Sequence, residues 1–430
     1  MELSKSTITV YRGSHQIGGC ATEIATENHR IIIDLGANLP DTENAAVSDE
    51  KLAAAVFDGR PCNGVMFSHY HGDHIGLYKK IPQNVPMYIG KTAKKLLKIL
   101  TERLDKSPRV SEKGLPIIQK MYGYSPNKKL IFGDITVTPY VVDHSALDAY
   151  MFLVEVGSKR ILFTGDFREH GIAGENNRLE KLLGAYVHEV DILITEGTML
   201  SRIDETKHNP ILTESDLGKR AAELFRENKQ SVILVSSTNL DSIMEFYQNL
   251  PSDMAFVCDA YQARLMFAAM KDKGLYYPEY RPKIINGKPR VLHIVGDMDG
   301  LGEKENCRKA DFYKIWNSGF TMLTRTTPMF TGITKKLDDP LIIYSMWTGY
   351  LSGKHHNPKI TEFIGEHRTE ILHTSGHAYI ETLEKLIRLT KPKTVIPMHT
   401  ECADKFAEFP EFTPYRESVK VLQDSEKFFF

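Results

Sequence analysis

The feature that most constrains this chain is a cluster of polar side chains directly after a short apolar segment. Ser68-His69-Tyr70-His71-Gly72-Asp73-His74 follows Val65-Met66-Phe67. Imidazoles and a carboxylate so closely spaced, on a loop that leaves a strand, can surround two adjacent cations. A lone histidine in a polar loop would need no metal, but this group would be poorly compensated without one. The spacing H-x-H-x-D-H therefore indicates a metal site.

More candidate ligands lie further along the chain, each just past an apolar, strand-like segment. They are His144, Asp166 and His399. Taken singly, each could equally be a turn residue, because His and Asp are common where strands end. Their shared position at strand ends, together with the first cluster, favours one metal centre.

Composition bounds the class of protein. The chain has 430 residues, of which 42% are hydrophobic and 25% charged, so it is globular and long enough for two domains. Its 54 Lys and Arg residues are balanced by 55 Asp and Glu residues. Nonspecific nucleic-acid binders usually carry a basic excess, so the balance counts against such a substrate. A local groove or bound metal could still hold phosphate.

Neither a membrane segment nor a disulfide framework is expected. No run approaches the about 20 apolar residues that span a bilayer, and no signal-type stretch precedes the first strand-like segment. We therefore expect a soluble, cytoplasmic protein. The cysteines are odd in number and never form a C-x-x-C pair, which argues against disulfides and thiolate zinc sites. They are Cys20, Cys62, Cys258, Cys307 and Cys402.

The pattern of predicted strands and helices changes along the chain. Up to about residue 204, short strands alternate with turns, and helical periodicity appears at 48–57 and 92–103. From 205 onward, helices and strands alternate regularly, which predicts a small α/β domain with a parallel sheet. The final strands are expected at 419–422 and 427–430.

The ligand cluster, the later histidine, Thr164-Gly165-Asp166 and the final histidine together resemble the metallo-β-lactamase superfamily. The resemblance implies an αββα sandwich with two divalent metal ions, zinc or alternatively manganese. Asp34, in Ile33-Asp34-Leu35-Gly36, matches an early aspartate that supports the ligand loop, although an ordinary turn aspartate would look the same. The implied ligands are His69, His71 and His144 for the first metal, Asp73, His74 and His399 for the second, and Asp166 as a bridge.

Two late motifs resemble the β-CASP branch of that superfamily, and most closely bacterial ribonuclease J. They are His373-Thr374-Ser375-Gly376-His377-Ala378 and Pro397-Met398-His399-Thr400-Glu401. The resemblance covers nearly the whole chain, although the sequence ends too soon after His399 for the C-terminal domain of ribonuclease J. It implies a metallo-β-lactamase domain in two parts, 1–204 and 351–430, with an α/β β-CASP domain inserted at 205–350.

The implied chemistry is hydrolysis of an RNA phosphodiester. A hydroxide held between the metals would attack the phosphorus in line, with Asp73 acting as ligand and catalytic residue. His377 would protonate the leaving oxygen, and Glu196 would orient its imidazole and raise its pKa. Ser375, Gly376 and Ser345 are expected to contact substrate phosphate, although capping and turn formation explain them equally well.

Other functions stay open at this stage. A hydrolase of a small phosphodiester or ester suits the neutral charge, and a DNA-directed nuclease would use the same fold. No residue can be tied to a 2′-hydroxyl, so the sequence does not separate RNA from DNA. An inactive scaffold is disfavoured, because all of the implied ligands are present. The mode of cleavage, the native metal and assembly into a homo-oligomer are left undecided.

Overall fold

The computed structural model describes residues 6–39, 47–108, 110–209, 211–271, 280–303 and 305–430. The chain divides into two compact units, and each is described by itself. The first unit comprises Met1–Glu169, Ala173–His208 and Gly376–Phe430. The second comprises His170–Ile172 and Asn209–Ser375.

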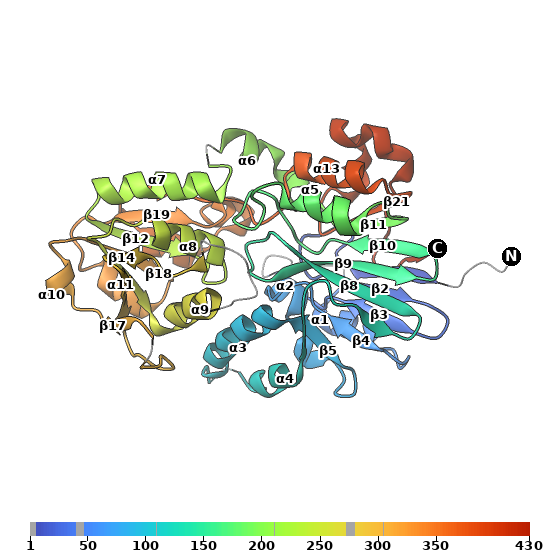
Figure 1. Ribbon diagram of the computed structural model, residues 1–430, viewed down its shortest axis with the longest axis horizontal. Helices are drawn as coiled ribbons and strands as arrows, with labels where there is room; N and C mark the ends of the chain where they lie inside the picture. The colour runs from blue at the N-terminus through green and yellow to red at the C-terminus, as the bar shows by residue number, and fades with distance from the viewer. Residues whose placement is uncertain (1–5, 40–46, 109, 210, 272–279, 304) are drawn as a thin grey trace. The chain divides into compact units, whose positions relative to one another are not determined.

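The first unit is built on two stacked sheets (Figure 1). One runs in the order β22 (Lys427–Phe429), β1 (Thr7–Arg12), β2 (Ala21–Ala25), β3 (Arg30–Ile33), β4 (Gly64–Met66), β5 (Met87–Gly90) and β6 (Tyr122–Tyr124). The other runs in the order β21 (Thr394–Met398), β11 (Ile192–Glu196), β10 (Lys159–Phe163), β9 (Ala149–Val156), β8 (Ile135–Val142) and β7 (Leu130–Phe132).

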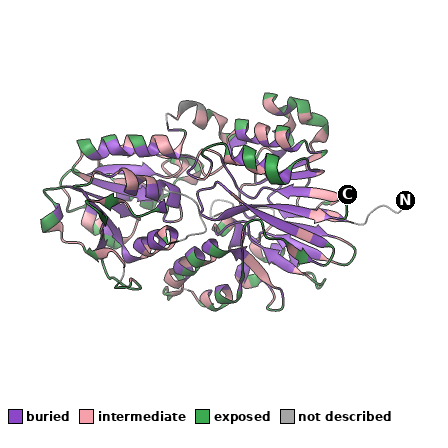
Figure 2. Ribbon diagram, in the orientation of Figure 1, coloured by how far each residue is buried: buried purple, intermediate pink, exposed green. Residues whose placement is uncertain are grey.

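Alternating side chains give the second of these sheets two apolar faces. In β10, Ile161 and Phe163 join a core cluster that contains residues of both sheets, whereas Leu162 joins a cluster on the opposite face. Successive side chains of a strand point to opposite faces, so such a strand must be covered on both sides. Helix α13 (Ile380–Thr390) covers the outer face with Leu383 and Leu386. Figure 2 shows these strands as buried along most of their length.

Helices also cover the outer face of the first sheet. Helix α1 (Asp49–Val56) buries Leu52 and Val56, and Ser48 caps it by accepting a hydrogen bond from the Lys51 N–H. The longer helix α3 (Lys91–Asp105) follows β5 directly. Both lie where the sequence periodicity predicts helices. The resulting helix–sheet–sheet–helix order confirms the αββα sandwich.

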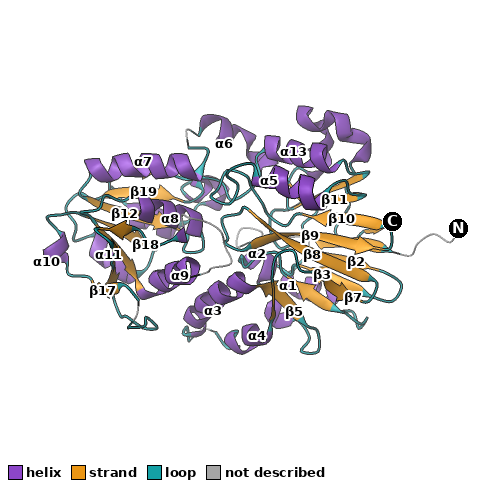
Figure 3. Ribbon diagram, viewed as in Figure 1, coloured by secondary structure: helices purple, strands orange, loops and turns teal. Residues whose placement is uncertain are grey.

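The second unit contains a parallel sheet flanked by helices (Figure 3). Its neighbouring strands pair in parallel in the part of the chain that is described, as the helix–strand alternation predicts. The strand order is β17 (Cys307–Lys309), β16 (Leu292–Val295), β13 (Ala255–Asp259), β18 (Phe320–Thr324), β12 (Gln230–Val235), β19 (Leu341–Ser345) and β20 (Thr369–Ile371). The principal helices are α7 (Glu214–Glu227), α8 (Leu240–Asn249), α9 (Ala260–Met270), α11 (Pro328–Thr334) and α12 (Pro358–Ile364).

The compact units and the expected segment boundaries differ. The second unit continues to Ser375 and does not end at residue 350, because β20 pairs with β19 as an edge strand of its sheet. The expected strand at 419–422 is also absent: Val419 makes only an isolated bridge to Val395. The names given to the segments stay predictions. Within the described ranges, no helix is both long and apolar enough to cross a membrane.

Candidate metal centre

Strand ends of the first unit carry the candidate ligands. Strands β10, β11 and β21 are neighbours and run parallel, so their carboxyl ends meet at one edge of the sheet. Asp166 lies just past β10, Glu196 ends β11 and His399 follows β21. His144 lies just past the end of β8. This edge therefore gathers residues that are far apart in the sequence.

The loop after β4 contributes the remaining ligand candidates. His69 and His71 lie in the loop, and Asp73 and His74 lie in the short helix α2 (Gly72–Ile75). The loop is tied down by its backbone, because the Cys20 N–H donates to the Asp73 carbonyl oxygen at 3.0 Å. Position 36 beside this loop requires glycine, because a Cβ there would lie 1.6 Å from the Asp73 carbonyl oxygen.

His69, His71 and His144 form the first donor group. Their ligand nitrogens lie within 4.8 Å of one another. The Nε2 atom of His144 is 3.2 Å from Nδ1 of His71. Three converging imidazoles match the donor set of a zinc site that keeps a further position open.

Asp73, His74, Asp166 and His399 form the second donor group, again with ligand atoms within 4.8 Å. Oδ2 of Asp166 lies 3.1 Å from His74 Nε2 and 3.6 Å from His399 Nε2. The same oxygen is 4.0 Å from Nε2 of His69 in the first group. Asp166 thus faces both groups, as a bridging carboxylate would.

Hydrogen bonds fix the ring orientation of the candidate histidines. For four of them Nδ1 has a partner outside the cluster, which leaves Nε2 pointing inward. The exception is His71, whose Nδ1 faces Nε2 of His144. The Nδ1 partners are Ser68 Oγ for His69 at 3.0 Å, Asp34 Oδ2 for His74 at 2.8 Å, the Gly376 carbonyl for His144 at 2.6 Å, and Thr198 Oγ1 for His399 at 2.7 Å.

Several inward-facing atoms lack a protein partner. Among the described residues, Nε2 of His69, Nε2 of His74 and Oδ1 of Asp166 are buried without a hydrogen bond. Buried polar atoms are normally satisfied, so these atoms call for a ligand. Imidazole nitrogens and carboxylate oxygens are what divalent zinc binds. The residues therefore fit a divalent metal in each donor group.

The protonation states of the first donor group and of Asp166 suit metal binding. Burial and the neighbouring imidazole of His71 hold the pKa of His144 well below its usual range, and burial lowers the pKa of His71 to about 4. Burial opposes ionisation of Asp166, but His399 and His74 outweigh it and hold the pKa of that carboxyl well below its usual range. Neutral imidazoles and ionised carboxylates are the forms that coordinate cations. In the second group burial lowers the pKa of His74, but the carboxylates of Asp166 and Asp73 outweigh it and raise that pKa well above its usual range.

Asp34 supports the ligand loop from below. It accepts hydrogen bonds from the Ser68 N–H at 2.7 Å and the Ser68 hydroxyl at 2.8 Å, in addition to its contact with His74. Its φ of 61° lies in the left-handed region, which aspartate tolerates better than most residues. These contacts place Asp34 behind the ligand loop, and its support of the ligands stays a prediction.

His377 and Glu196 form a pair beside the second donor group. The Nδ1 atom of His377 lies 3.1 Å from Glu196 Oε2 and 3.6 Å from Asp166 Oδ2. Burial opposes the charged imidazolium, but the carboxylates of Glu196 and Asp166 outweigh it and raise the pKa of His377. The pair can hold a proton for donation. His377 also lies within metal-binding reach of Glu196, Asp166 and His399, so distance alone does not assign its role.

Comparison with known proteins agrees with this geometry. Residues 19–203 match the sequence model of the metallo-β-lactamase superfamily. Residues 366–408 match that of the Zn-dependent metallo-hydrolase RNA specificity domain. Residues 19–203 therefore contain a domain of the metallo-β-lactamase superfamily. The second match contains both His377 and His399, and the resemblance to ribonuclease J-like members is confirmed by the relatives found.

Similar proteins extend over nearly the whole chain. Ribonuclease J of Helicobacter pylori is 22% identical over 92% of this chain and 56% of its own length, so the chain spans little more than half of that relative. An RNase J-like protein of Methanocaldococcus jannaschii is 29% identical over 95% of this chain and 97% of its own length. The crystal structure of a protein of unknown function from Enterococcus faecalis V583 shares the fold, with a TM-score of 0.75, 21% identity and coverage of 99% and 100%.

Two of the three residues expected to contact phosphate, Ser375 and Gly376, have other partners through their backbone carbonyls. The Ser375 carbonyl accepts a hydrogen bond from His170 Nε2 at 2.8 Å, and the Gly376 carbonyl accepts from His144. A Cβ at Gly376 would lie 2.8 Å from Ser145 Oγ, so the close approach of Ser145 favours glycine. The hydroxyl of Ser345 is buried and makes no hydrogen bond with any described group. Contact of these residues with substrate stays a prediction.

Three residues that border the candidate metal centre have no role in the sequence-based prediction. Ser68 and Thr198 hold the rings of His69 and His399, as described above. Cys20 has its Sγ within 4.8 Å of the ligand nitrogens of His74 and His399. Ser68 lies inside the recognised motif and could have been found there. Thr198 and Cys20 are distant from the histidines in sequence, and only the folded chain brings them together.

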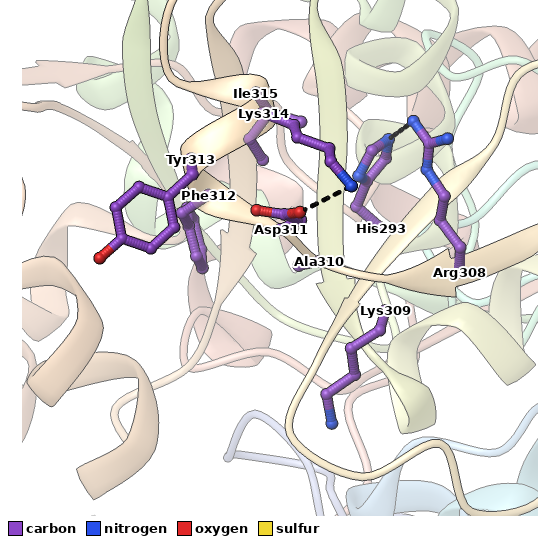
Figure 4. A pocket seen from close by; sticks show the side chains of 9 residues that line it. All are labelled: His293, Arg308, Lys309, Ala310, Asp311, Phe312, Tyr313, Lys314 and Ile315. Atoms are coloured by element: carbon purple, nitrogen blue, oxygen red, sulfur yellow. Dashed lines mark hydrogen bonds and ion pairs between the residues drawn. The ribbon is translucent and has the colours of Figure 1, made fainter.

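A separate shallow pocket in the second unit has a volume of about 700 Å³ (Figure 4). It contains none of the candidate site residues. Arg308 lies 3.3 Å from His293 Nε2, and Lys314 pairs with Asp311 at 3.1 Å. These charged groups satisfy one another, so we assign the pocket no role in the chemistry.

Proposed function

We propose that this chain is a metal-dependent phosphodiesterase that cleaves RNA. The observation that carries the proposal is the pair of donor groups sharing Asp166, with the His377–Glu196 pair beside them. The match of residues 366–408 to an RNA specificity domain and the ribonuclease J relatives support RNA as the substrate. The near-neutral charge leaves a small phosphodiester, or DNA, as the competing substrate.

The donor groups support a set of metal ligands for the proposed enzyme. His69, His71 and His144 would hold one divalent cation, and Asp73, His74 and His399 the other, with Asp166 between them. Two such cations supply Lewis-acid activation of the phosphodiester and a nucleophilic water ionised at neutral pH. Zinc suits the imidazole-rich set, with manganese as the alternative.

His377 would act as the general acid. Its Nδ1 faces Glu196, so the Glu196 carboxylate accepts the Nδ1 proton and leaves Nε2 to carry the proton that is donated. About one fifth of the His377 side chain is exposed (21%), whereas Glu196 is almost fully buried (1%). The imidazole can therefore reach a leaving oxygen while the carboxylate stays behind it. Protonation of the leaving 3′-oxygen prevents an unstable alkoxide from forming.

Glu196 also forms hydrogen bonds to the backbone next to the proposed bridging ligand and next to the proposed acid. Its Oε1 accepts the Phe167 N–H at 3.0 Å and the Ala378 N–H at 3.3 Å. Phe167 directly follows Asp166, and Ala378 directly follows His377. One carboxylate thus fixes the backbone beside the proposed bridging ligand and beside the proposed acid. This fits a residue that positions the acid without contacting substrate.

The test compares three substrates on one metal-loaded preparation. These are a 5′-phosphorylated, end-labelled RNA, a DNA of the same sequence, and a nitrophenyl phosphodiester. Cleavage of RNA well above the other two, abolished in His71→Ala, supports the proposal. Preferential cleavage of DNA would indicate a DNA-directed nuclease instead, and preferential cleavage of the nitrophenyl ester would indicate a hydrolase of small phosphodiesters. The label pattern also reports exonuclease or endonuclease mode and polarity.

A further inference from the structure

Glu214 is a buried carboxylate in the second unit that the proposed chemistry does not use. It is the first residue of α7, and only 1% of it is exposed. A buried glutamate is rare unless hydrogen bonds or a charged partner compensate for its lost hydration. Its contacts therefore indicate what it contributes to the structure.

The contacts of Glu214 reach helix α8 and two further chain segments, those of Thr374 and His170. Its Oε1 accepts a hydrogen bond from the Thr374 hydroxyl at 2.6 Å, and its backbone N–H donates to the His170 carbonyl at 3.0 Å. The Ser242 hydroxyl, in the first turn of α8, donates to both carboxylate oxygens at 3.1 and 3.0 Å. These hydrogen bonds compensate for the lost hydration of the buried carboxyl group.

The two segments also bond to each other. His170 donates from Nε2 to the Ser375 carbonyl at 2.8 Å. Together with the Glu214 contacts, this closes a ring through Thr374, Ser375 and His170. Each contact in the ring lies within the second unit.

Both segments continue directly into the candidate site. Thr374 and Ser375 precede Gly376, whose carbonyl holds His144, and then His377. His170 follows Asp166 along the chain by four residues. Between β20 and α13 the chain forms neither helix nor strand, so no backbone ladder fixes the loop that carries His377. Side-chain hydrogen bonds must therefore set its conformation.

We propose that Glu214 is a positioning residue, which anchors the loop of His377 through Thr374 and the segment after Asp166 through His170. Its catalytic consequence rests on the function proposed above, because it acts only by placing the proposed acid. The anchoring itself does not depend on that function. The two parts can therefore be tested separately.

The first test measures hydrogen–deuterium exchange in the full-length chain, with metal content determined for each variant. Thr374→Val removes the hydroxyl while keeping the side-chain shape, and Glu214→Gln removes the charged acceptor. We expect Thr374→Val to raise exchange of peptides covering 373–378 about tenfold, the effect of losing one buried hydrogen bond. Glu214→Gln should raise exchange there, whereas 166–172 should stay protected, because the substitution keeps the backbone N–H that donates to the His170 carbonyl.

Controls separate anchoring from general destabilisation. Glu223→Gln, on the exposed side of the same helix, where Glu223 pairs with Arg220, should exchange like the wild type. Thr374→Ser keeps a hydroxyl and should restore protection of 373–378. Unchanged exchange in both Thr374→Val and Glu214→Gln would overturn the proposal. So would faster exchange spread equally over the whole chain.

The second test uses the leaving group. If Glu214 places His377, both variants should lower kcat on RNA about tenfold with KM unchanged, and lose less on a nitrophenyl substrate that needs no acid. When either substitution is combined with His377→Ala, kcat on RNA should be no lower than in His377→Ala alone. Equal losses on both substrates would overturn the positioning role. If the wild type cleaves no phosphodiester, the proposed function fails, and the exchange experiment still decides the anchoring.

Discussion

Glu196 Oε2 lies 3.1 Å from Nδ1 of His377, although the two residues are 181 positions apart in the sequence. Glu196 ends β11 and is almost fully buried, whereas His377 lies in the loop before α13 and is partly exposed. A buried carboxylate behind a more exposed imidazole is the arrangement that fixes a tautomer and raises basicity. This relationship makes the proposed acid testable apart from the metal.

Glu196→Gln should lower the rate on RNA about tenfold and shift the pH profile. The carboxylate raises the pKa of His377 against the effect of burial, so removing the charge lowers it. A general acid works in its protonated form, and activity falls as pH rises through its pKa. We therefore expect the alkaline fall in kcat/KM to begin at lower pH in Glu196→Gln. An unchanged profile would exclude Glu196 from setting the protonation of His377.

Metal content should follow the two donor groups. The purified chain should bind close to two divalent ions, because each group offers a complete donor set. His71→Ala should lose one ion, and Asp166→Ala should weaken both sites, since Asp166 faces both groups. Both variants should lose detectable RNA cleavage. Elemental analysis with parallel rate measurement checks this, and full activity of a chelator-treated, metal-free chain would contradict it.

Asp34→Asn should weaken metal binding without removing a ligand. Asparagine has one acceptor oxygen, so it cannot receive the Ser68 N–H, the Ser68 hydroxyl and His74 Nδ1–H together. Loss of such a supporting partner commonly costs 10–100-fold in metal affinity. Competition with a chromogenic chelator measures the change. The effect should concentrate on the ion bound by His74, and an affinity equal to the wild type would show that Asp34 is only a turn residue.

Local sequence pattern predicts the ligand positions because each ligand lies at the end of a strand. Apolar alternation locates β4, β8, β10 and β21, and the polar residues that follow them meet wherever those strand ends meet. The parallel sheet of the second unit follows in the same way from its helix–strand alternation. These features depend on short segments, so a single sequence suffices to predict them.

Contacts made by the tertiary fold are harder to predict. Thr198 holds the ring of His399 across 201 positions of sequence, because β11 and β21 pair in parallel with Glu196 opposite Met398. Glu214 and Thr374 meet only because α7 begins beside the loop after β20. The extent of the second unit depends on a similar contact, since the short strand β20 has a weak pattern and its pairing with β19 decides its sheet.

The last prediction separates proton donation from metal binding at His377 and His399. His377→Ala should keep both metals and bind RNA, yet lose about 10²–10⁴-fold in rate, the usual contribution of a general acid. The loss should shrink on a nitrophenyl phosphodiester, whose leaving group departs without a proton. Metal analysis, RNA binding and rates on both substrates give the comparison.

His399→Ala should behave differently, although His399 lies close to His377 in space as well as in sequence. Its Nε2 points at Asp73 and Asp166 at 3.4 and 3.6 Å, whereas Thr198 fixes Nδ1 from behind. Removing this ring should empty or weaken the second metal site, and an activated leaving group should not restore the rate. If His377→Ala also loses metal, or if both variants respond alike to the nitrophenyl substrate, His377 is a ligand and the acid must be sought elsewhere.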